Sequence, residues 1–342
     1  MEESKKKSPG CCVILLIILL LLAVLITGLA AYGYNNVLGK INRVDGMEAT
    51  LSPEEIAAIE NETDYPGEVS GEFAALDEDG LFLGEGAELI EKNANTINIL
   101  LIGQDRRPGE GRTRSDSMIL CTINTEKKTM VMTSFLRDLY VDIPDWNGRT
   151  YLDNRLNACY VFGGMGMLDL ALKNNFGVQV DHNIEVDFSG FEEIIKIFGG
   201  VNITLTKAEA KHMAAFGVKE GPNFLTPEQA LYYSRIRYID SDFGRTNRQR
   251  NVLMSLLNSV KDMNTDQMTQ LVNKILPMLT TDMSNADITG YMMRILPILP
   301  ELEITTQHIP ASGAYKSCYV RGMAVLVPDL EANRAILRDT LS

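Results

Sequence analysis

The stretch INILLIGQDRRPGEGRTRSDSMILCTINTEKKTMVMTSFLRDLYVDIP, residues 97–144, decides the fold of this chain. Residues 97–102 and 118–123 are apolar runs of strand length, and residues 129–134 form a third. A polar, glycine-rich loop joins the first two runs, and an Arg-Asp pair follows the third. The stretch therefore predicts three consecutive strands whose ends carry charged side chains.

The charges in this stretch are those that a phosphate-bearing substrate and a divalent metal require. They include Asp105, Arg106, Arg107, Arg112, Arg114, Asp116, Arg137 and Asp138. Each arginine fork can hold two phosphate oxygens, and Mg²⁺ prefers oxygen ligands that it shares with phosphates. The alternative interpretation is a solvated loop whose ordinary surface ion pairs contribute little.

A second cluster of the same kind lies far downstream, in YYSRIRYIDSDFGRTNRQR, residues 232–250. Its charged residues include Arg235, Arg237, Asp242, Arg245 and Arg248, and Gly244 allows a tight backbone turn among them. Arg245, Arg248 and Gln249 are three and four positions apart at an expected helix start, so they share a face beside an anion-favouring helix terminus. Arg248 and Arg250 could instead pair with acids on the surface. Two distant basic clusters, each with a carboxylate, indicate one phosphate site.

The rest of the chain alternates between helix and strand patterns. Two helix starts carry capping signals, Ser189 with Glu192, and Thr226 with Pro227 and Gln229. Helices are expected over residues 155–176 with a glycine interruption, 190–198, from 227, around 252–260, within 263–294 and over 330–341. Strands are expected over residues 183–187, 201–205, 302–309 and 324–327. This alternation predicts an α/β domain with one sheet covered by helices.

The amino-terminal region predicts a membrane anchor. Residues 11–31 are apolar or small, about the 20 residues that cross a bilayer as a helix, and three lysines precede them. The positive-inside rule then places residues 1–10 in the cytoplasm and the part after the helix at 11–32 outside the cell. A cleaved signal peptide is the competing interpretation.

Residues 33–94 are strongly acidic and predict a solvated stalk that spaces residues 95–342, the catalytic domain, from the bilayer. Ser52, Pro53 and Glu55 mark the start of one short helix within this stalk. The net charge of −13 argues against a general nucleic-acid binder, because such a protein presents a basic field.

The five cysteines do not form a disulfide framework. Cys11 and Cys12 lie at the expected membrane edge, and Cys121 lies in a strand-like run and is expected in the core. Cys159 and Cys318 could pair in an exported domain, although spacing in the sequence cannot report the distance between them. The histidines stand outside all of these motifs and are expected to be structural.

Three motifs together resemble the LytR-CpsA-Psr family of cell-wall glycopolymer transferases. They are the loop from Gly103-Gln104-Asp105-Arg106 to Arg114-Ser115-Asp116, the pair Arg137-Asp138 before Tyr140-Val141-Asp142-Ile143-Pro144, and residues 233–249 with their Asp-Phe-Gly-Arg-x-x-Arg-Gln pattern. The resemblance spans roughly residues 95–261, and a family-type ending is expected over residues 262–342. Two positions depart from the family pattern: Gln104 replaces a usual Ser or Thr, and Phe135-Leu136 stands where a proline is common.

The resemblance implies an α/β/α fold, in which helices cover both faces of a mixed sheet and leave a hydrophobic tunnel for a polyprenyl tail. It implies transfer of a teichoic acid or capsular polysaccharide from undecaprenyl pyrophosphate to the 6-hydroxyl of N-acetylmuramic acid in peptidoglycan, outside the membrane. By the same resemblance Asp105 and Asp116 bind Mg²⁺. Arg106, Arg137, Arg237 and Arg245 grip the pyrophosphate, Arg114, Arg235, Arg248 and Gln249 support them, and Asp242 orients the arginines.

Two other functions are compatible with the same residues. Water could replace the sugar hydroxyl, which would make the protein a polyprenyl-pyrophosphate hydrolase. Alternatively, the ectodomain could bind wall polyanions or regulate without catalysis. Phosphoryl transfer itself needs little beyond positioning and positive charge, so no Ser/His/Asp constellation is required.

Overall fold

The computed structural model describes residues 38–44, 51–64, 74–75, 86–104, 111–236, 239–240, 242–261, 271 and 273–341. Its strands are β1 (Asn42–Arg43), β2 (Ala74–Ala75), β3 (Thr96–Gln104), β4 (Ser115–Asn124), β5 (Thr129–Phe135), β6 (Tyr140–Val141), β7 (Asn154–Arg155), β8 (His182–Asp187), β9 (Val201–Leu205), β10 (Gly221–Leu225), β11 (Leu279–Thr281), β12 (Glu303–Ile309), β13 (Tyr315–Val320) and β14 (Met323–Pro328). Its α-helices are α3 (Pro53–Glu60), α4 (Leu156–Phe176), α5 (Phe188–Phe198), α6 (Lys207–His212), α7 (Pro227–Arg235), α8 (Asp242–Lys261), α10 (Asn285–Ile295) and α11 (Leu330–Leu341). Short 3-10 turns span Ala214–Phe216, Leu276–Met278 and Leu296–Glu301.

A mixed sheet in the order β1-β11-β8-β3-β4-β5-β12 forms the centre of the molecule. The antiparallel meander β3-β4-β5 is the predicted set of three strands, and β8 and β12 flank it in parallel with β3 and β5. Strands buried on both faces are apolar almost throughout, which explains the near-continuous apolar runs in this part of the sequence.

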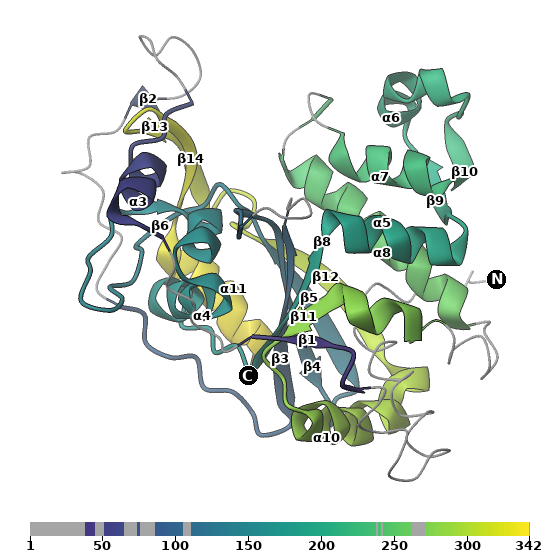
Figure 1. Cartoon of the computed structure of the whole chain (residues 1–342), viewed down its shortest axis with the longest axis horizontal. Helices are drawn as coiled ribbons and strands as arrows, with labels where there is room; N and C mark the ends of the chain where they lie inside the picture. The colour runs from purple at the N-terminus through teal and green to yellow at the C-terminus, as the bar shows by residue number, and fades with distance from the viewer. Residues whose placement is uncertain are drawn as a thin grey trace, which may run out of the picture.

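Helices cover both faces of this sheet, as Figure 1 shows. Ile97 and Ile99 of β3 pack in a core with α5, α7 and α8 on one side. Leu100 and Ile102 point to the other side and pack with α4 and α11. Successive side chains of a strand alternate between faces, so one strand contributes to both cores. The predicted α/β fold with helices on both faces is confirmed.

Local capping signals were reliable in two cases and wrong in one. Ser52 with Glu55, and Thr226 with Gln229, form complete capping boxes. The helix after β8 instead begins at Phe188, and the Asp187 side chain accepts the hydrogen bond from Gly190 N at 2.7 Å. Ser189 is therefore inside this helix, because strand β8 runs into α5 without a loop and Asp187 already occupies the cap position.

The structure confirms one glycine prediction and corrects one helix prediction. Gly163 and Gly164 kink α4 with non-helical backbone angles, as the glycine interruption indicated. Gly199, at a φ of 77°, ends α5. The expected helices within residues 263–294 are wrong in part, because residues 279–281 form β11 and pair with β8 in the central sheet. Strand β13 was not predicted; with β14 and β2 it forms a second, smaller sheet.

Part of the predicted stalk belongs to the folded body. Leu38 is fully buried, β1 pairs with β11, and Ile56 of α3 packs in the core beside α4 and α11. The described residues of segment 33–94 are therefore not a solvated spacer, because their few apolar side chains find partners in the domain. The predicted anchor at 11–32 lies outside the described residues, and no described helix has both the length and the apolar character needed to cross a bilayer.

None of the described cysteines forms a disulfide, and all three are buried. Cys121 lies in the core as predicted, while Cys159 and Cys318 belong to separate apolar clusters and do not pair. Burial raises the pKa of the Cys159 thiol well above its ordinary value. Cys11 and Cys12 lie outside the part of the chain that the structure describes.

Candidate active site

The carboxyl ends of β3 and β8 lie side by side and locate the candidate site. These strands are parallel, with Gln104 opposite Asp187, and the antiparallel β4 begins at the same edge with Ser115 opposite Gln104. Asp116 is the next residue of β4. The charged loop leaves the sheet here, so the topology brings the predicted phosphate and metal ligands to the strand ends.

An apolar cavity of about 110 Å³ opens at this edge, between the sheet and α5, α7 and α8. Its walls are mostly aliphatic and aromatic and include Leu101, Ile119, Ile184, Val186, Phe191, Ile194, Leu253 and Leu279. Its polar lining includes Gln104, Asp116, Ser234 and Gln249. Because Gln104 and Asp116 lie at the strand ends while Leu101 and Ile119 lie deeper in the sheet, the cavity is polar toward the edge and apolar within.

This cavity joins the two motifs that the sequence predicted to converge. Asp116 comes from the first charged stretch, and Gln249 from α8 in the second, more than a hundred positions later. Ser234, next to Arg235 in α7, lines the same cavity. Residues from two distant motifs thus line one cavity.

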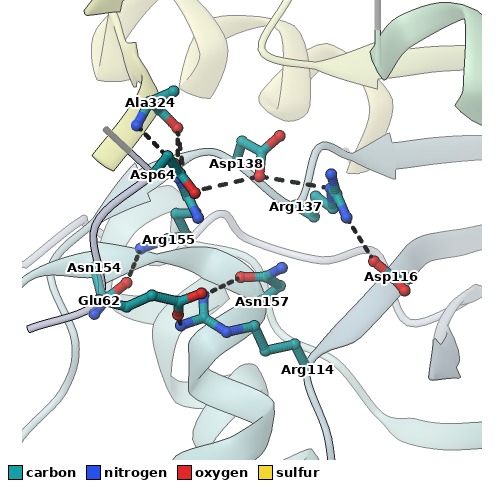
Figure 2. Close-up of polar contacts among 10 residues, drawn as sticks. All are labelled: Glu62, Asp64, Arg114, Asp116, Arg137, Asp138, Asn154, Arg155, Asn157 and Ala324. Carbon is teal, nitrogen blue, oxygen red and sulfur yellow. Dashed lines mark hydrogen bonds and ion pairs between the residues drawn. The ribbon is translucent and has the colours of Figure 1, made fainter. Parts of the chain in front are cut away.

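In the first cluster Arg137 is held between two carboxylates, as Figure 2 shows. Its Nη1 lies 2.8 Å from Asp116 Oδ1, and its Nε lies 3.5 Å from Asp138 Oδ1. The side chains of Arg137 and Asp116 are each about one-fifth exposed. A guanidinium in this position can exchange its Asp116 contact for a phosphate oxygen without leaving the second carboxylate.

Arg114, the neighbouring predicted phosphate ligand, pairs with Glu62 and donates to Asn157 Oδ1 at 3.4 Å. Glu62 follows helix α3, so a residue from the predicted stalk reaches the predicted site (Figure 2). Asp105, Arg106 and Arg107 lie outside the described residues, and their predicted roles stay predictions.

In the second cluster Arg248 is turned into the protein. It is 1% exposed and donates to both carboxylate oxygens of Asp240 at 2.7 and 2.8 Å, and to Ile236 O at 2.9 Å. Gly244 makes this possible, because a Cβ at that position would lie 2.2 Å from the Asp240 carboxylate. The predicted supporting role of Arg248 in phosphate binding is untested, but its contacts are those of a structural residue.

The other described residues of the second cluster differ in their burial and position. Arg245 is 3% exposed near the start of α8, whereas Arg235 is exposed at the end of α7. Asp242 is the first residue of α8. Arg237 lies outside the described residues.

Sequence reasoning missed a buried network behind the charged loop. Gln104 accepts from Thr113 N at 3.1 Å and donates to Glu185, which also accepts from the Tyr160 hydroxyl. Thr113 and Gln104 flank the loop that carries Asp105 and Arg106, so this network ties the two ends of the loop together. Gln104 replaces the family's usual Ser or Thr. This departure was the only feature of the sequence that pointed to the network.

The residues present fit a magnesium ion that is shared with substrate. Mg²⁺ is commonly held by one or two carboxylates, with phosphates and water completing its ligands. Asp116 supplies one partly exposed carboxylate at the polar edge of the cavity. Across the described ranges, no group of three or more His, Cys, Asp or Glu side chains gathers closely enough to bind a metal unaided.

A sequence profile of the LytR_cpsA_psr family matches residues 59–338. The chain belongs to this family. The match confirms the resemblance seen in the three motifs and extends it to residue 338, within helix α11.

Individual relatives agree with this assignment. A Bacillus licheniformis protein named polyisoprenyl-teichoic acid–peptidoglycan teichoic acid transferase TagU is 36% identical over 168 residues, or 48% of this chain and 53% of that protein. Biofilm regulatory protein A of Streptococcus mutans is 31% identical over 204 residues, or 56% of this chain and 50% of the relative. The chain thus spans about half the length of these curated relatives. The crystal structure of protein gbs0355 from Streptococcus agalactiae shares the fold, with a TM-score of 0.61 and 24% identity over 72% of this chain and 88% of that one.

Proposed function

We propose that this LytR_cpsA_psr protein is a membrane-anchored phosphotransferase that attaches a glycopolymer to the cell wall. Its donor is a teichoic acid or capsular polysaccharide on undecaprenyl pyrophosphate, and its acceptor is N-acetylmuramic acid of peptidoglycan. The chain crosses the membrane once through residues 11–32, with its amino terminus in the cytoplasm and the catalytic domain outside. The name of the Bacillus licheniformis relative, a polyisoprenyl-teichoic acid–peptidoglycan transferase, supports this substrate class.

The observation that carries the proposal is the apolar cavity with charged and amide groups at its open edge. A polyprenyl chain requires an apolar enclosure, and its diphosphate requires positive charge and a metal at the entrance. Asp116 and Gln249 lie in this cavity together with Leu253 and Phe191. The arrangement therefore supports a ligand that is apolar at one end and anionic at the other.

In the proposed reaction, the 6-hydroxyl oxygen of the acceptor attacks the phosphorus bonded to the glycopolymer. A new P–O bond forms to the acceptor, the P–O bond to the lipid phosphate breaks, and undecaprenyl phosphate leaves. Asp116 or Asp242 accepts the hydroxyl proton. The product is a phosphodiester, so no oxidant or second energy source is needed.

The chain's arginines stabilise the charge that spreads over the phosphate oxygens in the transition state. Arg137 is already held between Asp116 and Asp138 and contributes a fixed fork. Arg106, Arg237 and Arg245 complete the grip, while Arg114 and Arg235 support it from nearby. Mg²⁺, held by Asp105 and Asp116, supplies further positive charge to the diphosphate when bound.

A transfer assay tests this function against hydrolysis. The full-length protein in detergent is incubated with an undecaprenyl-pyrophosphate-linked glycan and Mg²⁺, with and without peptidoglycan fragments. We expect glycan–peptidoglycan phosphodiester only when both substrates are present. Release of a phosphorylated glycan at equal rates without peptidoglycan would identify a hydrolase, and the absence of any turnover, with retained lipid binding, would identify a noncatalytic binding protein.

A further inference from the structure

A line of alternating charges connects the segment after α3 to the candidate site. In order, it consists of Asp64, Arg155, Asp138, Arg137 and Asp116 (Figure 2). The line begins in residues that the sequence assigned to a stalk and ends at the predicted metal ligand. None of the motifs that identify the family includes Asp64 or Arg155.

Arg155 is the buried centre of this line. Its side chain is 9% exposed at the start of α4, and burial lowers its pKa from the ordinary value. It forms an ion pair with Asp64 and donates from Nε and Nη2 to Ala324 O at 3.2 and 3.1 Å. A buried guanidinium is costly unless carboxylates compensate it, so its position depends on the acids around it.

Three contacts fix the position of Asp64, so its carboxylate is a well-placed partner for Arg155. Its backbone N–H donates to Gly322 O at 3.0 Å, its Oδ2 accepts from Ala324 N at 2.9 Å, and the same carboxylate pairs with Arg155. The segment after α3 is thereby attached to strand β14 and to the amino-terminal end of α4.

Asp138 lies between the two arginines. Its Oδ1 is 3.8 Å from Arg155 Nε and 3.5 Å from Arg137 Nε. When substrate and metal engage Asp116 and Nη1 of Arg137, the contact at Nε still restricts rotation of the Arg137 fork. If Asp64 loses its charge, its repulsion of Asp138 disappears, and the Asp138 carboxylate can move toward Arg155 and away from Arg137.

We propose that Asp64 and Arg155 are positioning residues that hold Asp138 in place, so that Asp138 keeps the Arg137 guanidinium aimed at the substrate diphosphate. This inference rests on the proposed function. It makes the segment that follows α3 part of the catalytic apparatus, so an intact link between the amino-terminal region and the domain is needed for full activity.

The test uses the full-length protein and its variants Asp64→Asn, Asp138→Asn and the double variant. Asn at position 64 keeps an oxygen for Ala324 N, so the backbone attachment is preserved while the charge is removed. We expect each single variant to lower kcat about tenfold and the double variant to lower it by little more, because residues that act through one another are non-additive. Glu54→Gln, an exposed carboxylate on α3, is the matched control and keeps wild-type kcat.

Two further measurements separate positioning from folding and from the proposed function itself. Urea unfolding corrects kcat for the folded fraction, and Arg155→Lys, which keeps the charge but loses the fork, should reproduce the loss in a folded protein. Calorimetric titration with inorganic pyrophosphate and Mg²⁺ should give affinity about fivefold weaker in Asp64→Asn than in wild type.

Wild-type kcat and pyrophosphate affinity in folded Asp64→Asn would overturn the inference, as would losses that multiply in the double variant. A wild-type protein that binds pyrophosphate without transferring glycan would instead refute the proposed function, and the binding data would still decide the role of Asp64.

Discussion

The two arginine clusters combine the same residue types, arginines with carboxylates, but have different surroundings. Arg137 and Arg114 in the first cluster are about one-fifth exposed, and their carboxylate partners also reach the surface. Arg248 in the second cluster is buried, and its guanidinium is bound to Asp240 and to the carbonyl of Ile236. The comparison teaches that arginines predicted for one phosphate site can have two different roles: those of the first cluster are available to a ligand, whereas Arg248 of the second holds the local structure together.

The two kinds of arginine differ in how readily their guanidinium groups can exchange one partner for another. A partly exposed ion pair contributes little stability, so a phosphate can replace the carboxylate at small cost. A buried fork that satisfies a carboxylate and a backbone carbonyl leaves these groups unpaired if it moves. We therefore expect substitutions in the first cluster to affect activity and substitution of Arg248 to affect stability.

Arg137→Ala should have the largest effect. We expect transfer to fall about 10³-fold, or roughly 4 kcal/mol of transition-state stabilisation, because a positioned donor to the phosphate oxygens is lost. The melting temperature should change little. Steady-state rates and thermal unfolding measure both quantities, with Arg338→Ala, an exposed arginine paired with Glu331, as the control. Unchanged transfer would remove Arg137 from the site.

Arg248→Met should show the opposite pattern. We expect the free energy of unfolding to fall by about 3 kcal/mol, since buried Glu209 and the Ile236 carbonyl lose their cationic partner. Urea unfolding measures this loss, and Arg248→Lys should recover part of it through the charge alone. If Arg248→Met were fully stable but inactive, Arg248 would belong with Arg137 as a ligand.

Leu253→Trp tests the cavity that lies between the clusters. The larger ring fills apolar space, so we expect co-purified polyprenyl lipid to be lost and transfer to fall about tenfold, roughly 1.4 kcal/mol. Mass spectrometry of the detergent-extracted protein measures the lipid. Leu253→Met conserves side-chain volume and should retain it. Full lipid occupancy in the Trp variant would place the lipid elsewhere.

The smallest effect that we expect is a change of stability with pH. It arises at the opposite end of the sheet from the candidate site, at Asp169 and His182, and contrasts with both clusters. Burial raises the pKa of Asp169 to about 7, and the charge of Asp282 adds to this increase. Burial tends to lower the pKa of His182, but its hydrogen bond to Asp282 and the charges of Asp282, Asp287 and Asp181 outweigh burial and raise it. Both groups thus bind protons more tightly in the folded state.

Stabilisation from such groups is complete below their unfolded pKa values and is lost as pH rises through the folded ones. We expect the free energy of unfolding to fall by about 1 kcal/mol between pH 6 and pH 8. Asp169→Asn should remove much of this dependence, as urea unfolding at both values can measure. A variant with the wild-type pH dependence would show that Asp169 titrates normally.

Local features of the sequence were enough to predict much of the fold. The strands β3, β4, β5 and β9, the caps at Ser52 and Thr226, and the terminal helix over 330–341 were all predicted, because alternation and capping depend on residues a few positions apart. The short strand β11 was missed, since three residues carry no clear period and their pairing with β8 depends on distant parts of the chain.

For the site, the sequence by itself determined the residue types and the family motifs, and hence that arginines and carboxylates meet near strand ends. Only the tertiary structure decided the partners: Arg248 with Asp240, Arg114 with Glu62, and Arg155 with Asp64. Opposite charges attract each other at short range, whatever their separation in the sequence. Which acid reaches which guanidinium is therefore set by the packing of whole elements, as when α3 comes to lie against the core beside α4.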